Sequence, residues 1–178
     1  MRLSSFIIIS GCSGGGKSTL IDELALRGHA TVPEPGRRVV REQQASGGSA
    51  LPWADTRAFV DRIVAMAKAD HANAAANAGW TFFDRGLIDA LSALSTLTGA
   101  PLSRESLAAY PFRRQVFLAP PWPEIYETDA ERKHSLAEAE IEYRRLAELY
   151  PALGYEIILL PKTSVAARAD FVERTLQT

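Results

Sequence analysis

Cysteine is almost absent from this sequence, and several other signals are missing with it. Cys12 is the single cysteine, so the chain cannot form an internal disulfide. The three histidines (His29, His71 and His134) lie far apart, and no Cys/His spacing resembles a zinc site. No apolar run approaches the ~20 residues that span a bilayer. We therefore expect a soluble cytoplasmic protein that does not bind membranes.

An excess of charge of one sign is also absent. Twenty basic and 21 acidic residues give a formal net charge of −1. Such a balance provides no general attraction to nucleic acid, so we expect no nucleic-acid partner. Hydrophobic residues make up 47% of the chain, which is enough for the core of a single domain spanning residues 1–178. No pattern indicates an oligomeric state.

The sequence does contain a regular alternation of strand and helix patterns. Short β-branched or aromatic runs predict five strands, at 6–9, 30–33, 80–83, 115–119 and 155–160. Amphipathic segments predict helices at 17–27, 37–45, 55–77, 87–97, 104–109 and 135–149, and a last helix after Ser164. Because this alternation requires crossover connections, we predict an α/β fold, a three-layer α/β/α sandwich around a five-stranded parallel sheet.

Residues 11–19, GCSGGGKST, follow the first predicted strand and match a phosphate-binding loop; we call them the phosphate loop. Glycines let successive backbone N–H groups converge on phosphate oxygens, and the following helix adds its free N–H groups. Lys17 would place a charge on the β- and γ-phosphates, and Ser18 would offer a hydroxyl to Mg²⁺. The predicted nucleotide-binding residues are Gly11, Cys12, Ser13, Gly14, Gly15, Gly16, Lys17, Ser18 and Thr19.

Two other interpretations of this stretch remain as alternatives. Residues 11–15 fit G-x-S-x-G, the nucleophile elbow of α/β-hydrolases, with His134 as a candidate base. The elbow strand of that fold follows several earlier strands, however, and the motif leaves Lys17 and Ser18 unexplained. Residues 9–12 resemble a lipoprotein cleavage box, but only four strongly apolar residues precede it, against roughly 7–15 in a signal peptide. Both alternatives are weaker than a phosphate loop.

Charged residues follow the next two strands. Glu34 stands after the second strand and Asp84-Arg85 after the third. Because ligands of open parallel sheets bind beyond the carboxyl ends of the strands, we expect these groups to meet the phosphate loop. The simpler interpretations are a solvated turn for Glu34, a helix cap for Asp84 and a surface ion pair for Arg85.

Three motifs carry a resemblance to known proteins: "EPG" at 34–36, "FFDRG" at 82–86 and "DAERK" at 129–133. They resemble motifs of the nucleoside and nucleotide kinase branch of the P-loop NTPases, where "DAERK" corresponds to the lid. The whole chain is similar to a bacterial family of small P-loop proteins that carries an AAA label, itself similar to ribosylnicotinamide kinase domains. The resemblance implies the P-loop NTPase fold, for which we expect strand order 2-3-1-4-5, and a lid-like loop at about 120–134.

The resemblance also implies roles for individual residues. Asp84 would hold Mg²⁺ together with Ser18. Glu34 would orient the acceptor hydroxyl or accept its proton, and Arg85 would contact the acceptor or a phosphate. Arg132, from the lid, would bind the nucleotide and neutralise charge on the transferred phosphoryl group. With Lys17, these form the predicted catalytic set, and ATP and Mg²⁺ are the implied cofactors.

We therefore predict a kinase that transfers the γ-phosphoryl group of ATP to a small, nucleoside-like acceptor. The alternative is a nucleotide-dependent switch regulated by a protein partner, although the [NT]-K-x-D motif that reads guanine is absent. The thiol of Cys12 lies next to a helix N-terminus, where a thiol pKa tends to fall. An inert residue that lines the turn is the preferred interpretation of Cys12.

Overall fold

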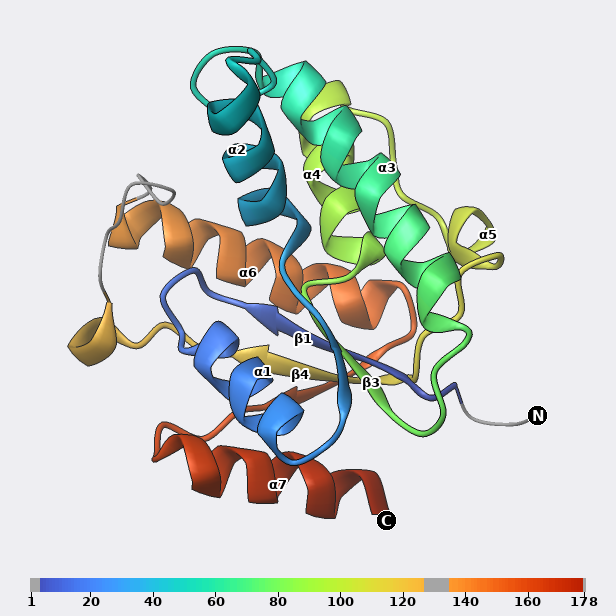
Figure 1. Ribbon diagram of the computed structural model, residues 1–178, viewed down its shortest axis with the longest axis vertical. Helices are drawn as coiled ribbons and strands as arrows, with labels where there is room; N and C mark the ends of the chain where they lie inside the picture. Colours follow the sequence, from blue (N-terminus) through green and yellow to red (C-terminus); the bar gives the residue numbers. More distant parts are fainter. Residues whose placement is uncertain (1–3, 127–134, 178) are drawn as a thin grey trace.

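The structure is a computed structural model that describes residues 4–126 and 135–177 (Figure 1). One parallel sheet is formed by β1 (Phe6–Gly11), β2 (Ala30–Val32), β3 (Thr81–Asp84), β4 (Gln115–Ala119) and β5 (Glu156–Leu159). The strand order is β2-β3-β1-β4-β5, which confirms the predicted order. Because β1 is central and its two neighbours are reached by later crossovers, the loop after β1 lies at the point where the strand order reverses.

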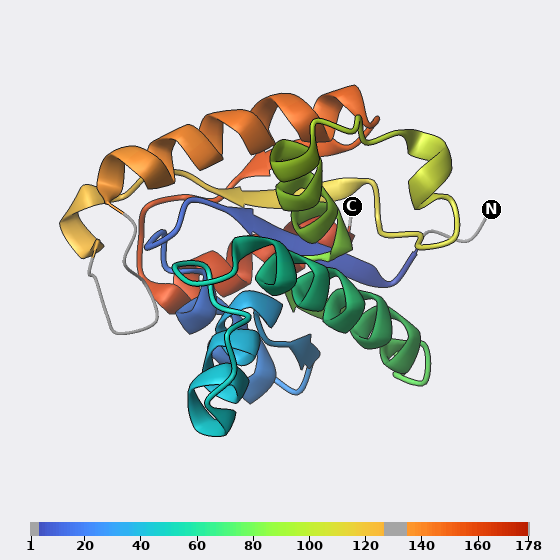
Figure 2. The ribbon, with the colours of Figure 1, turned by 90° about the horizontal axis from the view of Figure 1, so that it is seen from above.

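Helices cover both faces of the sheet (Figure 2). One face packs against α1 (Lys17–Leu26) and α7 (Val165–Gln177), and the other against α4 (Leu87–Thr98) and α6 (Leu136–Ala152), with α3 (Thr56–Ala74) beside α4. The side chains of β1 alternate: Ile7 and Ile9 belong to the core under α1 and α7, whereas Ile8 belongs to the core on the opposite face. This alternation follows from the period of two in a strand and makes β1 buried on both sides. Among the described residues, no helix has both the length and the apolarity that a membrane span requires.

Three shorter elements complete the fold: α2 (Pro35–Ser46), α5 (Arg104–Leu107) and the 3-10 helix η1 (Pro123–Ile125). The predicted helices are all present, but the 3-10 helix was not predicted. The prediction that a helix extends to residue 77 is wrong, because α3 gives way to turns after Ala74. Two predicted helix starts are confirmed. The Asp55 carboxylate accepts a hydrogen bond from the Ala58 amide (2.9 Å), and Ser135 with Glu138 forms a capping box.

Candidate functional site

The phosphate loop connects the end of β1 to the start of α1, and its glycines are required by their geometry. Gly14 and Gly16 have φ angles of 77° and 72°, in the left-handed region that favours glycine. Gly11 has φ 114°, and a Cβ added there would lie 2.3 Å from the carbonyl oxygen of Ala119. The Cys12 amide donates to that same oxygen (2.9 Å), so the loop starts in close contact with β4. The backbone therefore has the turn that the sequence motif predicts.

Lys17 is the first residue of α1, and its side chain is buried against the loop. Its Nζ donates a hydrogen bond to the carbonyl oxygen of Cys12 (2.7 Å). Burial lowers the pKa of Lys17, and the nearby Arg85 lowers it further. Since an ammonium group has three donors, two remain for phosphate oxygens.

Asp84 is the last residue of β3, and its carboxylate faces the start of α1. The Ser18 hydroxyl donates to Oδ2 of Asp84 (2.9 Å), whereas Oδ1 is buried without a hydrogen-bond partner among the described residues. Burial, and then the negative charge of Glu34, raise the pKa of Asp84 to about 6. A buried carboxylate oxygen that lacks a donor, next to a hydroxyl, has the chemistry of a ligand for a hard cation.

Ser18 and Asp84 fit a magnesium ion better than a metal ion whose ligands all come from the protein. Within the described residues there is no group of three or more His, Cys, Asp or Glu side chains that could hold a metal. Magnesium needs no such group, because it keeps several waters and binds through one or two protein ligands and the substrate phosphates. Ser18 and Asp84 would therefore hold the ion, as the sequence predicts.

Arg85 follows Asp84, and its guanidinium is surrounded by carboxylates. It donates to both carboxylate oxygens of Glu142 (3.0 and 2.9 Å) and to the carbonyl oxygen of Gly11 (3.2 Å). Its Nε also lies 3.3 Å from Oε1 of Glu34. Burial alone would lower the pKa of Arg85, but the charges of Glu142 and Glu34 raise it well above its usual value. Of the described non-glycine residues, Arg85 is the one with a positive φ (61°), a strained conformation that the surrounding ion pairs hold in place.

Glu34 lies immediately before α2, with Pro35 as the first helical residue. One carboxylate oxygen of Glu34, Oε2, lies 3.5 Å from Nε of Arg37, and the other, Oε1, lies 3.3 Å from Nε of Arg85. The charged residues after β2 and β3 thus meet at the carboxyl edge of the sheet, next to the phosphate loop, as expected from the topology. Arg132, the predicted lid arginine, lies outside the described residues together with the rest of 127–134.

Glu142 is a site residue that the sequence did not reveal. It belongs to α6, where a glutamate in an amphipathic pattern resembles part of a solvated face. In the structure Arg85 lowers the pKa of Glu142 even though burial opposes the shift. The partner is 57 residues away in the chain, and no local pattern indicates such a pair.

A second polar network, centred on Asp89, lies beneath Arg85. Oδ2 of the buried Asp89 accepts hydrogen bonds from the Gly86 amide (2.9 Å) and from the Tyr150 hydroxyl (2.7 Å), and Oδ1 accepts one from the hydroxyl of Ser10. Burial, and the adjacent carboxylate of Asp89, raise the pKa of Tyr150 well above its usual value. This network ties α4 and α6 to β1 beneath Arg85.

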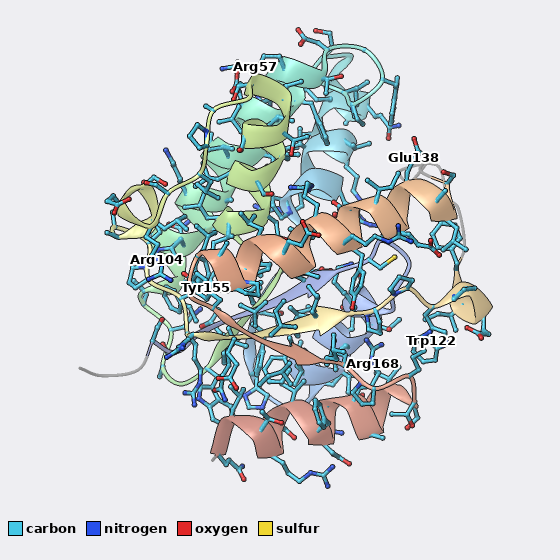
Figure 3. All side chains as sticks on the ribbon, turned by 180° about the vertical axis from the view of Figure 1, so that it is seen from behind. Arg57, Arg104, Trp122, Glu138, Tyr155 and Arg168 are labelled. Carbon is cyan, nitrogen blue, oxygen red and sulfur yellow. The ribbon has the colours of Figure 1, made fainter. Side chains whose placement is uncertain are left out.

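Arg168, on α7, is a further residue that the sequence did not single out. It is fully buried, and its two terminal nitrogens donate to the carbonyl oxygens of Gly16 and Gly15, both at 3.0 Å. Figure 3 shows that its neighbour Trp122 comes from the segment after β4. The phosphate loop is therefore contacted by two arginines from elements that are distant in sequence, the partly buried Arg85 and the fully buried Arg168.

Cys12 is buried inside the loop, and its thiol hydrogen bonds to the Ser13 carbonyl oxygen (3.2 Å). Burial raises the pKa of this thiol, and the positive charge of Lys17 only partly offsets the effect. The expectation of a lowered pKa from the helix N-terminus is therefore wrong, because desolvation outweighs the favourable charges. The geometry agrees with an inert residue that lines the turn.

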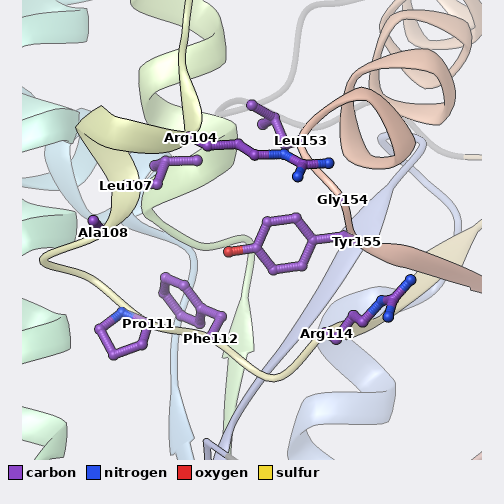
Figure 4. A pocket seen from close by; sticks show the side chains of 9 residues that line it. All are labelled: Arg104, Leu107, Ala108, Pro111, Phe112, Arg114, Leu153, Gly154 and Tyr155. Carbon is purple, nitrogen blue, oxygen red and sulfur yellow. The ribbon is translucent and has the colours of Figure 1, made fainter.

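A pocket of about 290 Å³ lies at the other end of the sheet (Figure 4). Its walls include Arg104, Phe112, Arg114 and Tyr155, which stand before the amino ends of β4 and β5. The phosphate loop lies at the carboxyl ends of the strands, so this pocket is not part of the site.

Comparisons with known proteins agree with the fold. A family model described as "AAA domain" matches residues 6–168. Deoxyadenosine kinase from M. mycoides with bound dATP has a similar structure, with 14% identity, a TM-score of 0.67, and coverage of 99% of this chain and 100% of that chain. Shikimate kinase from Acinetobacter baumannii in complex with shikimate has 18% identity and a TM-score of 0.54, over 97% of this chain and 90% of that chain. A search of curated proteins found no match. At such identities the structural likeness shows the fold alone, which is that of the P-loop NTPases of the nucleoside and nucleotide kinase type.

Proposed function

The chain belongs to the family of AAA domains, and we propose that it is a kinase that transfers the γ-phosphoryl group of ATP to a hydroxyl of a small metabolite. The observation that carries this proposal is the position of Asp84. It places one buried carboxylate oxygen, which has no hydrogen-bond donor within residues 4–126 and 135–177, beside Ser18 and next to the phosphate loop. A nucleotide polyphosphate and its magnesium ion would satisfy both the loop amides and this oxygen.

On the donor side, the loop amides and Lys17 would bind the phosphates of ATP. Lys17 would keep its hydrogen bond to the Cys12 carbonyl oxygen and direct its other two N–H donors at phosphate oxygens. A magnesium ion would be held by Ser18 and Asp84, and it would neutralise the charge that develops on the transferred group. The protein contributes mainly position and fixed charge, which are the principal sources of rate in phosphoryl transfer.

On the acceptor side, Glu34 would orient the attacking hydroxyl and receive its proton. Its side chain is 22% exposed, so a substrate can reach it. Arg85 is already paired with Glu34 and Glu142, and this offsets its charge. We therefore propose that Arg85 holds Glu34 in place and that the acceptor presents an uncharged hydroxyl. The nucleoside and the shikimate named for the two structural relatives are substrates of those proteins, and they support a search among hydroxylated metabolites.

The decisive experiment is a screen of hydroxylated metabolites, nucleosides first, with detection of ADP. One acceptor should increase ADP release from MgATP far above the rate without acceptor. Lys17→Ala should abolish this increase by removing the positive charge that faces the phosphates, and Asp84→Asn should remove the Mg²⁺-dependent activity while leaving the fold intact. Acceleration by a protein partner, but by no metabolite, would contradict the proposal and favour a nucleotide-dependent switch.

A further inference from the structure

Arg168 is buried completely, yet no carboxylate accompanies it among the described residues. Burial lowers the pKa of its guanidinium, and no described carboxylate offsets this effect. Its Nε has no hydrogen-bond partner there either. Burying an uncompensated guanidinium is costly, so its position calls for a specific interaction.

The interaction is with two consecutive carbonyl groups of the phosphate loop. Nη1 donates to the oxygen of Gly16 and Nη2 to the oxygen of Gly15, both at 3.0 Å. A Cβ on Gly16 would lie 2.6 Å from Nη1, so glycine at this position is needed for the approach as well as for φ. The planar fork of arginine can reach two oxygens at once, which a lysine ammonium does less well.

Holding these carbonyls also fixes the direction of the next two amides. A trans peptide unit is planar, and its C=O and N–H point in opposite directions. The Gly15 carbonyl therefore sets the direction of the Gly16 N–H, and the Gly16 carbonyl sets that of the Lys17 N–H. Both N–H groups then point away from Arg168, and Lys17 belongs to the helix start, where amides have no partner inside the helix.

The segment after β4 covers this arrangement. The centre of the Trp122 ring lies 5.5 Å from Cζ of Arg168, at the distance of a cation–π contact. Beside it, Ile125 is close to Gly16, and a Cβ on Gly14 would lie 2.5 Å from the ring of Tyr126. Side chains from the β4–α6 connection and from α7 thus enclose the loop on the side of Arg168.

We propose that Arg168 is a positioning residue that aims the Gly16 and Lys17 amides at the β-phosphate of the bound nucleotide, with Trp122 fixing its guanidinium. This inference rests on the proposed nucleotide site. The positive charge of Arg168 lies behind the loop and adds to the field at the phosphate. Arg168 acts through the loop backbone and does not itself touch the nucleotide.

The test is the contribution of the β-phosphate to affinity, measured as the ratio of the Kd for AMP to the Kd for MgADP. Arg168→Met keeps the apolar length of the side chain but removes the fork, and it should reduce this ratio about tenfold while AMP binds as before. The ratio for Arg168→Lys should lie between that of the unsubstituted protein and that of Arg168→Met, because lysine retains the charge without the paired geometry. Arg174→Met, on the exposed face of the same helix, is the matched control and should leave the ratio unchanged.

A purely structural role would appear differently. It would lower the thermal midpoint of the nucleotide-free protein and leave the ratio within about twofold of that of the unsubstituted protein, and this result would overturn the proposal. If Arg168→Met does not fold, the same ratio of Kd values is measured on Arg168→Lys and Trp122→Leu. Failure of the unsubstituted protein to bind MgADP would contradict the proposed function itself, and this inference with it.

Discussion

Arg85 and Arg168 contact opposite ends of the phosphate loop, and their charges are balanced in different ways. Arg85 donates to the carbonyl of Gly11 and is paired with Glu34 and Glu142. Arg168 donates to the carbonyls of Gly15 and Gly16, and its described surroundings contain the ring of Trp122 but no carboxylate. The first arrangement is a partly buried ionic network, whose members depend on one another. The second is a single cation held by backbone dipoles, whose removal leaves no opposite charge behind.

The largest difference should appear when each arginine is replaced by methionine. Arg85→Met leaves the partly exposed Glu34 and Glu142 without their shared cation, and we expect a loss of about 2–4 kcal/mol in the free energy of unfolding. Arg168→Met removes hydrogen bonds but also a buried charge, so its loss should be no more than about 2 kcal/mol. Urea unfolding at pH 7.5 without nucleotide measures both.

Two controls separate charge from backbone strain in this comparison. Methionine at position 85 must adopt the same positive φ as arginine, so the strain stays constant. Adding Glu142→Gln to Arg85→Met should recover part of the loss, since one uncompensated carboxylate is then neutral. Equal losses in the free energy of unfolding for Arg85→Met and Arg168→Met would show that the ion pairs of Arg85 add nothing to its contribution to stability.

A middle-sized effect is expected at Asp84, where burial makes the ionised carboxylate unfavourable. Its pKa is raised from 3.8 to about 6 in the folded protein, so the ionised form is less stable there than in the unfolded chain. Stability is therefore lost as the pH rises from about 4 to 6, and the loss is constant above that range. In EDTA, Asp84→Asn should be more stable than the unsubstituted protein by about 1–3 kcal/mol at pH 7.5 and equally stable below pH ~4.

The measurement is the thermal or urea midpoint of both proteins across that pH range. Asp61→Asn, at an exposed helix position, serves as the control and should not produce this pH dependence. A pH-independent difference between Asp84→Asn and the unsubstituted protein would show that the Asp84 carboxylate is not destabilised by ionisation.

The smallest effect concerns Cys12, which reports on the end of the loop that Arg85 holds. Because the thiol is buried and its pKa is raised, alkylation at pH 7.5 should be at least about tenfold slower in the folded protein than in urea. Bound MgATP should slow it further. Glu142→Gln, which loosens Arg85 beside Gly11, should speed the reaction more than Arg168→Met does. Equal rates in folded and unfolded protein would contradict the buried position.

The parts of this site that the sequence predicted are those that local patterns and topology control. The phosphate loop is a contiguous motif whose glycines report φ angles and close approaches. Glu34, Asp84 and Arg85 follow from the rule that parallel strands present their carboxyl ends at one edge. Their catalytic roles remain predictions, as does the role of Arg132, which lies outside the described residues.

The residues that the sequence did not reveal belong to helices and make contacts over long separations. Glu142 and Arg168 stand 57 and 152 residues from partners that they bind, in helical patterns that resemble ordinary solvated faces. The Cys12 pKa was mispredicted for a related reason. Proximity to a helix start is visible in the sequence, but the burial that dominates the shift arises only from packing.

The contact between α7 and the phosphate loop has a consequence for attempts to reduce the protein to a minimal nucleotide-binding fragment. A fragment built from β1, the loop and α1 would keep every letter of the motif. It would lose the donors that come from near the other terminus and orient the peptide planes at Gly15 and Gly16. Searches for the motif find chains that can form the turn, whereas we expect that transplanting nucleotide binding would require carrying α7 along with it.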